Sequence, residues 1–192
     1  MRKIIIKAIG TWLNLLAILA PRTAGRKGFF LFCTPLGSPL KPYQHQFLDT
    51  AEKFTIEFEG SYLQCYRWGT GRKNVLFLHG WQSHTYRWKN YIESFSPEEY
   101  TLYAFDAPGH GLSGGKYLNI PLYSRAIKAF ADQVSPLHSV VTHSLGGFAM
   151  LYTLHHHATL LVLQLILTPV PGQAAEFVKF YQQTLGLSDR TI

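Results

Sequence analysis

The segment Val140-Val141-Thr142-His143-Ser144-Leu145-Gly146-Gly147 decides the fold prediction for this chain of 192 residues. A short apolar run leads directly into a serine, and small residues follow before an apolar stretch with helical spacing begins. This order predicts a sharp strand-to-helix turn that holds the hydroxyl of Ser144 up from the edge of a sheet, the layout of a nucleophile elbow. The alternative is that Ser144 is an ordinary helix N-cap, a position that serine favours.

The residues around this turn predict alternating strands and helices. Strands are expected at 54–58 and 62–68, joined as a hairpin at Glu59-Gly60, and at 75–78, 100–105, 139–142 and 160–167. Helices are expected at 86–95, 123–134, 145–155 and 174–185. This alternation indicates an α/β fold, a mostly parallel sheet with helices on both faces. In such sheets, sites form at the carboxyl ends of strands.

Two further motifs follow predicted strands. His79-Gly80-Trp81-Gln82 comes after the strand at 75–78, and Asp106-Ala107-Pro108-Gly109-His110-Gly111-Leu112-Ser113 comes after the strand at 100–105. Together with the serine turn, these motifs make residues 54–170 resemble the α/β-hydrolase family, in the expected order and strand context. The resemblance implies an α/β-hydrolase fold for this part of the chain.

The resemblance also implies roles for single residues. Ser144 would be the catalytic nucleophile, and the backbone N–H groups of Trp81 and Leu145 would form the oxyanion hole. Gly146 and Gly147 would let the backbone approach a neighbouring strand closely. Thr142 departs from the G-x-S-x-G pattern, although small residues other than glycine are tolerated there in the family.

Five more residues are expected to support this turn and its loops. His79 and Gly80 would belong to the oxyanion loop, with His79 as a structural histidine behind it. Asp106, with His110, would brace the loop after the strand at 100–105. His143 is predicted to be structural, because the residue before the nucleophile points away from it.

A serine hydrolase of this family also needs an acid and then a histidine after the serine. Glu176 is a weak candidate for the acid. The only histidines after Ser144 are His155-His156-His157, and none follows Glu176. The resemblance implies eight strands, and six are predicted here. The sequence therefore predicts a domain truncated at its carboxyl end, with the last strands missing and little activity.

The predicted function is that of a serine esterase or lipase acting on a small, apolar acyl substrate without a cofactor. The alternative is a non-catalytic binding module of the same fold that a partner completes. His84, Tyr86 and Trp88 would either line an acyl pocket or belong to the core. No metal site is expected at His155-His156-His157, because adjacent helical residues point in different directions.

A dinucleotide site is also not expected. The residues from Gly109 to Gly114 match G-x-G-x-x-G, but Pro108 precedes them and no helical pattern follows. Asp132, at a suitable distance for a ribose contact, falls in a predicted helix instead of at the end of a strand.

The charge of the chain is concentrated at its amino terminus. The whole chain has 18 Lys and Arg against 11 Asp and Glu, but residues 1–34 carry six of these bases and no acid. The remainder is nearly neutral, which argues against a nucleic-acid interface. Cys33 and Cys65 are too few for a disulfide framework and indicate a reducing, cytoplasmic location.

Three segments are predicted along the chain. Residues 1–34 form a basic, apolar helical leader, residues 35–53 a linker or wrapping loop, and residues 54–192 the partial hydrolase domain. Asn14 interrupts the apolar run of the leader, which is also too short for a membrane span. The leader is expected either to pack on the protein or to lie on a membrane surface.

Overall fold

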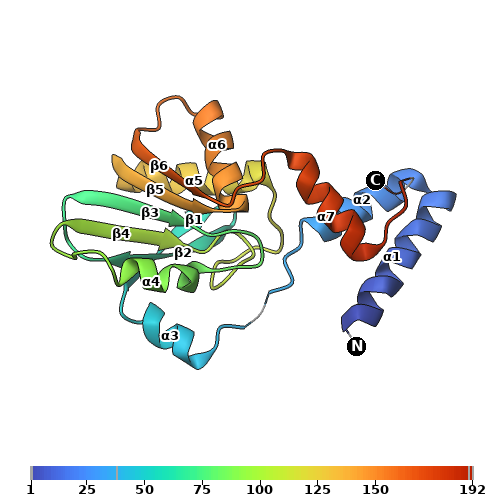
Figure 1. Ribbon diagram of the computed structural model, residues 1–192, viewed down its shortest axis with the longest axis horizontal. Helices are drawn as coiled ribbons and strands as arrows, with labels where there is room; N and C mark the ends of the chain where they lie inside the picture. Colours follow the sequence, from blue (N-terminus) through green and yellow to red (C-terminus); the bar gives the residue numbers. More distant parts are fainter. Residues whose placement is uncertain (1, 38, 190, 192) are drawn as a thin grey trace. The chain divides into compact units, whose positions relative to one another are not determined.

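The computed structural model describes residues 2–37, 39–189 and 191 and divides the chain into two compact units (Figure 1). The first, here called the helical unit, combines residues 1–34 with residues 171–192. The second, the sheet unit, comprises residues 35–170. This division differs from the expected one, because the last residues of the chain group with the leader instead of with the sheet.

The sheet unit contains one sheet of six strands in the order β1-β2-β4-β3-β5-β6. The strands are β1 (Glu52–Phe58), β2 (Ser61–Trp68), β3 (Lys73–Leu78), β4 (Tyr100–Phe105), β5 (Leu137–His143) and β6 (Val162–Thr168). β1 and β2 form the expected antiparallel hairpin, and β2 pairs antiparallel with β4. β4, β3, β5 and β6 run parallel, which confirms the predicted mostly parallel sheet.

Helices cover both faces of this sheet. They are α3 (Pro42–Leu48), the 3-10 turn η1 (Thr85–Trp88), α4 (Lys89–Ile92), α5 (Ile120–Val134) and α6 (Leu145–His156). On one face, Phe47 of α3 and Ile92 of α4 pack in a cluster with Phe77 and Leu102 of the strands. On the other face, the ring of Phe130 in α5 stacks on that of Phe105, with 5.4 Å between ring centroids.

Two expected segments differ from the structure. The helix expected at 86–95 is replaced by η1 and a single turn of α4, because Trp88, Ile92 and Phe95 pack onto the same cluster without a continuous helix. The expected linker at 35–53 contains α3, whose Phe47 and Leu48 are buried, and the first residues of β1. The linker therefore contributes to the core.

The helical unit consists of α1 (Arg2–Leu19), α2 (Pro21–Phe32) and α7 (Ala174–Leu185). Pro21 is the first residue of α2, so the leader is two helices instead of one. Leu13, Leu185 and Leu187 form the small core of this unit. A Cβ atom at Gly10 would lie 1.8 Å from the carbonyl oxygen of Leu185, so only glycine allows this approach of α1 to α7.

Asn14 connects α1 to the turn after α7. Its Nδ2 donates to the carbonyl oxygen of Gly186 at 3.0 Å, and its Oδ1 accepts from Ser188 N at 2.9 Å and Thr191 Oγ1 at 2.8 Å. The polar residue that interrupts the leader thus helps to hold residues 1–34 against the segment after α7. Within the described residues, no helix meets the length and hydropathy needed to cross a membrane.

Candidate functional site

Ser144 lies on the sharp turn between β5 and α6, at the carboxyl end of the sheet. Its φ of 51° and ψ of −120° place a non-glycine residue in a left-handed conformation, which costs backbone energy. Its backbone N–H donates to the carbonyl oxygens of Thr168 and Pro169, at 3.2 and 3.1 Å. The Ser144 side chain is half-buried and makes no capping hydrogen bond to α6, so Ser144 is not an ordinary capping serine.

The two glycines after Ser144 let α6 lie against the sheet. A Cβ atom at Gly146 would come within 2.6 Å of the carbonyl oxygen of Leu78, at the end of β3. A Cβ atom at Gly147 would lie 2.8 Å from Thr142 Oγ1 and 2.3 Å from Val170 Cγ2. Thr142 therefore fills space that Gly147 leaves open, which explains how a β-branched residue is accommodated before the turn.

The loop after β3 lies directly beside this turn. A Cβ atom at Gly80 would be 3.0 Å from both Ser144 Cβ and His143 Nδ1. Trp81 and Gln82 follow, and Gln82 has a φ of 51°. The structure therefore brings Gly80, at the start of the predicted oxyanion loop, into contact distance of Ser144.

Three backbone-to-side-chain hydrogen bonds join the loop after β3 to the loop after β4. His79 Nε2 accepts from Ala107 N at 2.9 Å, and His110 Nε2 accepts from Gln82 N at 3.1 Å. Asp106 Oδ1 accepts from Thr85 N at 2.8 Å. These bonds support the predicted bracing roles of the two loops with a specific geometry.

Both histidines are held neutral in one tautomer. Since each Nε2 accepts a hydrogen bond, the proton lies on Nδ1, which faces the carbonyl oxygen of Gly80 in His79 and of Pro108 in His110. Burial lowers the pKa of His79 to about 4, and nearby positive charges contribute. Burial likewise lowers the pKa of His110 to about 4.

Asp106 also holds its own loop in place. Its Oδ2 accepts from Leu112 N at 2.8 Å and from the hydroxyl of Tyr66 at 3.2 Å. Gly111 has a φ of 50°, and a Cβ atom there would lie 2.1 Å from Asp106 Oδ2. Burial, followed by the charge of Asp106, raises the pKa of Tyr66 above its ordinary value.

Two tyrosines at this site were not anticipated from the sequence. Tyr66 bonds Asp106 as described, and the hydroxyl of Tyr123, in α5, donates to the carbonyl oxygen of His79 at 2.9 Å. Both side chains are fully buried. The sequence offered only the general expectation that a buried tyrosine hydroxyl has a hydrogen-bond partner, which does not identify that partner.

Some buried polar side chains of the sheet unit have unused hydrogen-bonding capacity. In the described part of the chain, four buried polar atoms have no hydrogen-bond partner: His84 Nδ1, Thr85 Oγ1, Trp88 Nε1 and His143 Nδ1. Three of them follow the loop after β3, and the fourth precedes Ser144. Burial, together with the charge of Arg87, lowers the pKa of His143.

The aromatic residues after the oxyanion loop belong at least partly to the core. Trp88 is fully buried, with its ring centroid 5.3 Å from that of Phe77. Tyr86 packs edge-on against Phe47, with ring centroids 5.8 Å apart. The sequence left open whether these residues line an acyl pocket or belong to the core, and the structure supports the core for Trp88.

The candidate acid lies in the helical unit. Glu176 is in the first turn of α7, and its Oε1 accepts from Gly172 N at 3.0 Å and Gln173 N at 3.1 Å. This is a helix-capping arrangement, which accounts for Glu176 without a catalytic role. Among the described residues, no group of three His, Cys, Asp or Glu side chains could hold a metal ion.

The glycine-rich segment after β4 does not open a helix. The residues from Asp106 to Asn119 form an irregular loop between β4 and α5, in which Gly109 and Gly111 have positive φ values. A dinucleotide fingerprint requires such glycines at the start of a helix. The geometry agrees with the interpretation of this segment as a bracing loop.

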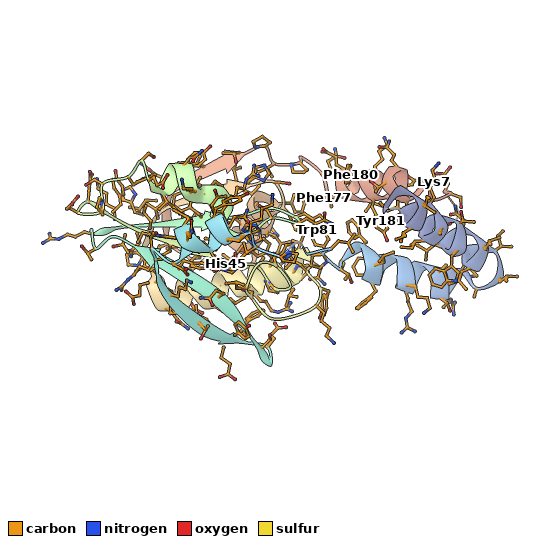
Figure 2. All side chains as sticks on the ribbon, turned by 90° about the horizontal axis from the view of Figure 1, so that it is seen from below. Lys7, His45, Trp81, Phe177, Phe180 and Tyr181 are labelled. Carbon is orange, nitrogen blue, oxygen red and sulfur yellow. The ribbon has the colours of Figure 1, made fainter. Side chains whose placement is uncertain are left out.

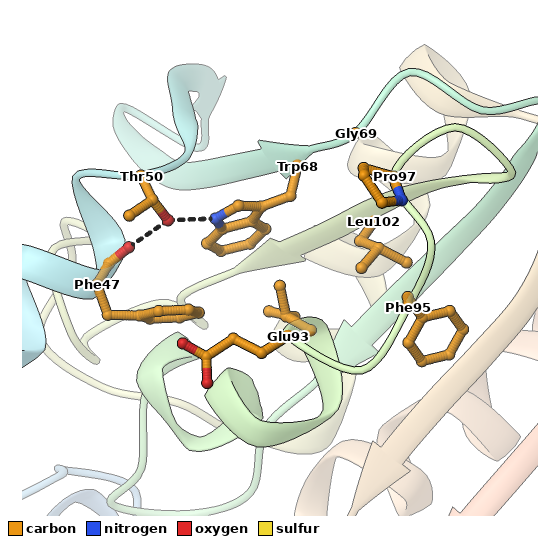
Figure 3. Close-up of a pocket in the computed structure, with 9 residues that line it drawn as sticks. Phe47, Thr50, Trp68, Gly69, Glu93, Phe95, Pro97 and Leu102 are labelled. Carbon is orange, nitrogen blue, oxygen red and sulfur yellow. Dashed lines mark hydrogen bonds between the residues drawn. The ribbon is translucent and has the colours of Figure 1, made fainter.

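A cavity of about 420 Å³ lies elsewhere in the sheet unit (Figure 3). Phe47, Trp68 and Leu102 provide apolar walls, and Glu93 lies at its side. Trp68 Nε1 donates to Thr50 Oγ1 at 2.9 Å. Because Trp68 ends β2 and pairs with Leu102 near the start of β4, this cavity lies toward the end of the sheet opposite Ser144.

Comparison with known proteins agrees with this geometry. A model of the alpha/beta hydrolase family matches residues 75–191. The pimeloyl-[acyl-carrier protein] methyl ester esterase of Nitrosomonas europaea is 34% identical over 74 residues, covering 38% of this chain and 28% of that protein. The dihydrolipoyllysine-residue acetyltransferase component of the acetoin cleaving system of Cupriavidus necator is 28% identical over 137 residues, covering 69% and 36%.

A solved structure shows the same fold. An epoxide hydrolase from Vigna radiata superposes with a TM-score of 0.58 and 23% sequence identity, covering 66% of this chain and 42% of that one. The chain thus spans less than half the length of each of these relatives.

Proposed function

The chain belongs to the alpha/beta hydrolase family, and from this membership we propose that it is a serine hydrolase that cleaves an ester or a related acyl bond through Ser144. The methyl ester esterase that is 34% identical over 74 residues supports an ester as the substrate. The many aromatic side chains are consistent with a small, apolar acyl group.

One observation carries the proposal, the backbone conformation of Ser144. A left-handed, non-capping serine between a parallel strand and a helix is strained, and strain of this kind is retained where it presents a side chain for function. Ser144 as a residue is half-buried, whereas the neighbouring Leu145 and Gly146 are buried. The turn thus supports Ser144 as the nucleophile.

The same turn supplies a site for the developing oxyanion. Leu145 is the first residue of α6, so its backbone N–H has no acceptor within the helix and lies at the positive end of the helix dipole. Trp81 follows Gly80, which is in contact distance of Ser144. We assign the backbone N–H groups of Leu145 and Trp81 to the oxyanion hole, each contributing about 3 kcal/mol to the transition state.

In the proposed reaction, Ser144 Oγ attacks the acyl carbon while its proton passes to a general base. The bond between the acyl carbon and the leaving oxygen then breaks, and the leaving group takes up a proton. Water hydrolyses the acyl-serine ester in a second step and regenerates the hydroxyl. The neutral, buried His79 and His110 hold the loops in this scheme and exchange no proton with the substrate.

Among the described residues, no general base with an orienting acid is positioned at Ser144. No histidine within them is hydrogen-bonded to Ser144, and the carboxylate of Glu176 caps α7. A serine hydroxyl without a base is a weak nucleophile. We therefore expect these 192 residues on their own to turn over substrate slowly.

Labelling with a fluorophosphonate probe tests the assignment of Ser144. In protein made from its native gene, the probe should attach at Ser144, as located by peptide mass spectrometry, and Ser144→Ala should abolish labelling. Ser94→Ala, which changes an exposed serine of the same unit, is the matched control and should label normally. Labelling at another serine, or unchanged labelling of Ser144→Ala, would refute the assignment.

The same experiment separates the alternative of a non-catalytic binding module. A protein that shows no covalent labelling, but binds an acyl ligand equally well with and without Ser144→Ala, would be a binding module of this fold. In that case, the strained turn would have a structural role only.

A further inference from the structure

Large apolar side chains dominate one exposed face of α1, which also carries Thr11. The exposed fractions are 72% for Ile4, 59% for Ile5, 48% for Trp12, 58% for Leu15, 62% for Ile18 and 86% for Leu19. At 100° per residue, these side chains fall on one continuous side of the helix. Large apolar side chains that gather in this way mark an interaction surface. We call this set of six residues the outer face of α1.

The opposite face of α1 is already occupied within the helical unit. Leu13 and Ala17 are buried, and Leu13 packs with Leu185 and Leu187 in the core of this unit. Asn14 forms its hydrogen bonds to the residues after α7 on this side. Because the face that carries Leu13 packs within the helical unit, the outer face of α1 is the one that we consider for a partner.

Positive charge accompanies this apolar surface. The six bases within residues 1–34 meet no acidic residue in that segment, whereas residues 35–192 are nearly neutral. Lys7 extends from α1 and is exposed (Figure 2). Lys27 Nζ, from α2, lies 5.8 Å from the centroid of the Trp12 ring and so adds charge beside the outer face.

Exposed aromatic side chains continue in the same unit. Phe29 and Phe30 of α2 are 61% and 58% exposed, and Phe180 of α7 is 71% exposed. Basic helices with exposed tryptophan, phenylalanine and leucine are typical of elements that lie in the interface of a bilayer. Apolar area provides the insertion energy there, and the bases attract anionic headgroups.

We propose that the outer face of α1 docks on an anionic phospholipid bilayer, with α1 lying in the plane of the headgroups. Its apolar side chains enter the boundary between headgroups and acyl chains, and Lys7 and Lys27 contact lipid phosphates. This inference concerns the helical unit alone and does not depend on the role of Ser144. It gives the protein a place on the membrane surface.

Co-sedimentation of the full chain with vesicles tests the proposal. The protein should bind vesicles of phosphatidylglycerol and phosphatidylcholine, and bind much less to pure phosphatidylcholine. Removing the charges of Lys7 and Lys27 by substitution with glutamine should lower the partition coefficient about five-fold for each charge. Raising the salt concentration should weaken binding to the anionic vesicles for the same reason.

The apolar contribution is tested by adding charge to the outer face. Leu15→Glu with Leu19→Glu should reduce partitioning at least about ten-fold, because two inserted side chains become charged. Leu161→Glu with Leu163→Glu is the matched control, since these leucines of the sheet unit are 63% and 76% exposed. The control adds the same two negative charges at a distance from α1, and it should bind vesicles as strongly as the unsubstituted chain.

Insertion has a local readout in Trp12. Brominated lipids should quench the fluorescence of the unsubstituted chain, and Trp12→Phe should remove most of the quenching while binding persists. Circular dichroism of each variant establishes that it is folded. No binding to anionic vesicles, or equal losses in the Leu15/Leu19 and Leu161/Leu163 variants, would overturn the proposal.

A second copy of the chain is the competing occupant of this surface. In that case, sedimentation velocity without lipid would show a dimer that Leu15→Glu with Leu19→Glu dissociates, and vesicles would bind none of the variants. This result would also overturn the proposal.

Discussion

His79 Nε2 accepts a hydrogen bond of 2.9 Å from the backbone N–H of Ala107, and this bond joins the loops that follow β3 and β4. It exists only while the imidazole is neutral, because a protonated ring has no acceptor. In the reverse sense, His110 of the loop after β4 accepts a hydrogen bond from the backbone N–H of Gln82 in the loop after β3. The placement of Gly80 beside Ser144 thus depends on two uncharged histidines.

Acid should therefore destabilise the sheet unit. The pKa of each histidine is lowered to about 4 in the folded chain, against an ordinary value of 6.5. Between these values the unfolded chain binds protons that the folded chain does not, so the free energy of unfolding falls as the pH drops from about 6.5 to 4. Each histidine would account for about 3 kcal/mol of this loss.

Urea unfolding at a series of pH values measures this effect. His79→Asn should be less stable at pH 7.5 but should show a shallower decline toward pH 4. His155→Asn, which changes an exposed histidine, should retain the full decline. A decline of the same slope in both variants would mean that His79 is not responsible for it.

Gly146→Ala should disturb the serine turn. The added Cβ atom would lie 2.6 Å from the carbonyl oxygen of Leu78 and 2.7 Å from that of His79, and backbone atoms there have no room to yield. We expect a loss of about 2–3 kcal/mol of stability and slower probe labelling of Ser144.

Gly25→Ala provides the contrast to this variant. Gly25 is exposed within α2, and a Cβ atom there meets nothing within 4 Å. The substitution should raise helix stability by up to about 1 kcal/mol and leave the labelling of Ser144 unchanged. Equal behaviour of the Gly25 and Gly146 variants would contradict the close approach of α6 to β3.

Asp106→Asn should loosen both bracing loops. The carboxylate accepts hydrogen bonds from Thr85 N, Leu112 N and the Tyr66 hydroxyl, and an amide can present only one acceptor oxygen to them. We expect a loss of about 2 kcal/mol and faster hydrogen exchange at Thr85 or Leu112. Tyr66→Phe removes only the 3.2 Å bond and should cost about 1 kcal/mol, without faster exchange at the other two amides.

Asn14→Ala should separate the two segments of the helical unit. It removes the hydrogen bonds to Gly186, Ser188 and Thr191, at a cost of about 2 kcal/mol. Hydrogen exchange followed by mass spectrometry should show α7 opening more often. Thr11→Ala, at an exposed position of the same helix, should leave the hydrogen-exchange rates in α7 unchanged. If the amides of α7 exchange as slowly in Asn14→Ala as in the unsubstituted chain, Asn14 does not hold α7 in place.

Much of the sheet unit could be predicted from the sequence. The hairpin at Glu59-Gly60, the strand at 100–105 and the helix at 145–155 were expected at or close to their observed bounds. Each depends on patterns within a few residues, namely alternating or continuous apolar runs and turn residues. The three motifs at strand ends indicated the family in the same local way, and the family is confirmed for residues 75–191.

The expected helix at 86–95 shows where local patterns stop being sufficient. Trp88, Ile92 and Phe95 have helical spacing, yet η1 and α4 together end at Ile92. Burial in the cluster around Phe77 satisfies these apolar side chains whether or not the backbone continues as a helix. Tertiary packing thus overrides a weak local preference.

The sequence by itself indicated the family, through the resemblance of its three motifs, and it indicated the alternation of strands and helices around Ser144, which follows from short-range periodicity. Only the tertiary structure decided that residues 171–192 join the leader, through bonds between Asn14 and residues 172 or more positions away. It also decided which backbone N–H groups His79, His110 and Asp106 bind across the two loops. Such contacts depend on how distant segments fold against each other, which no local pattern contains.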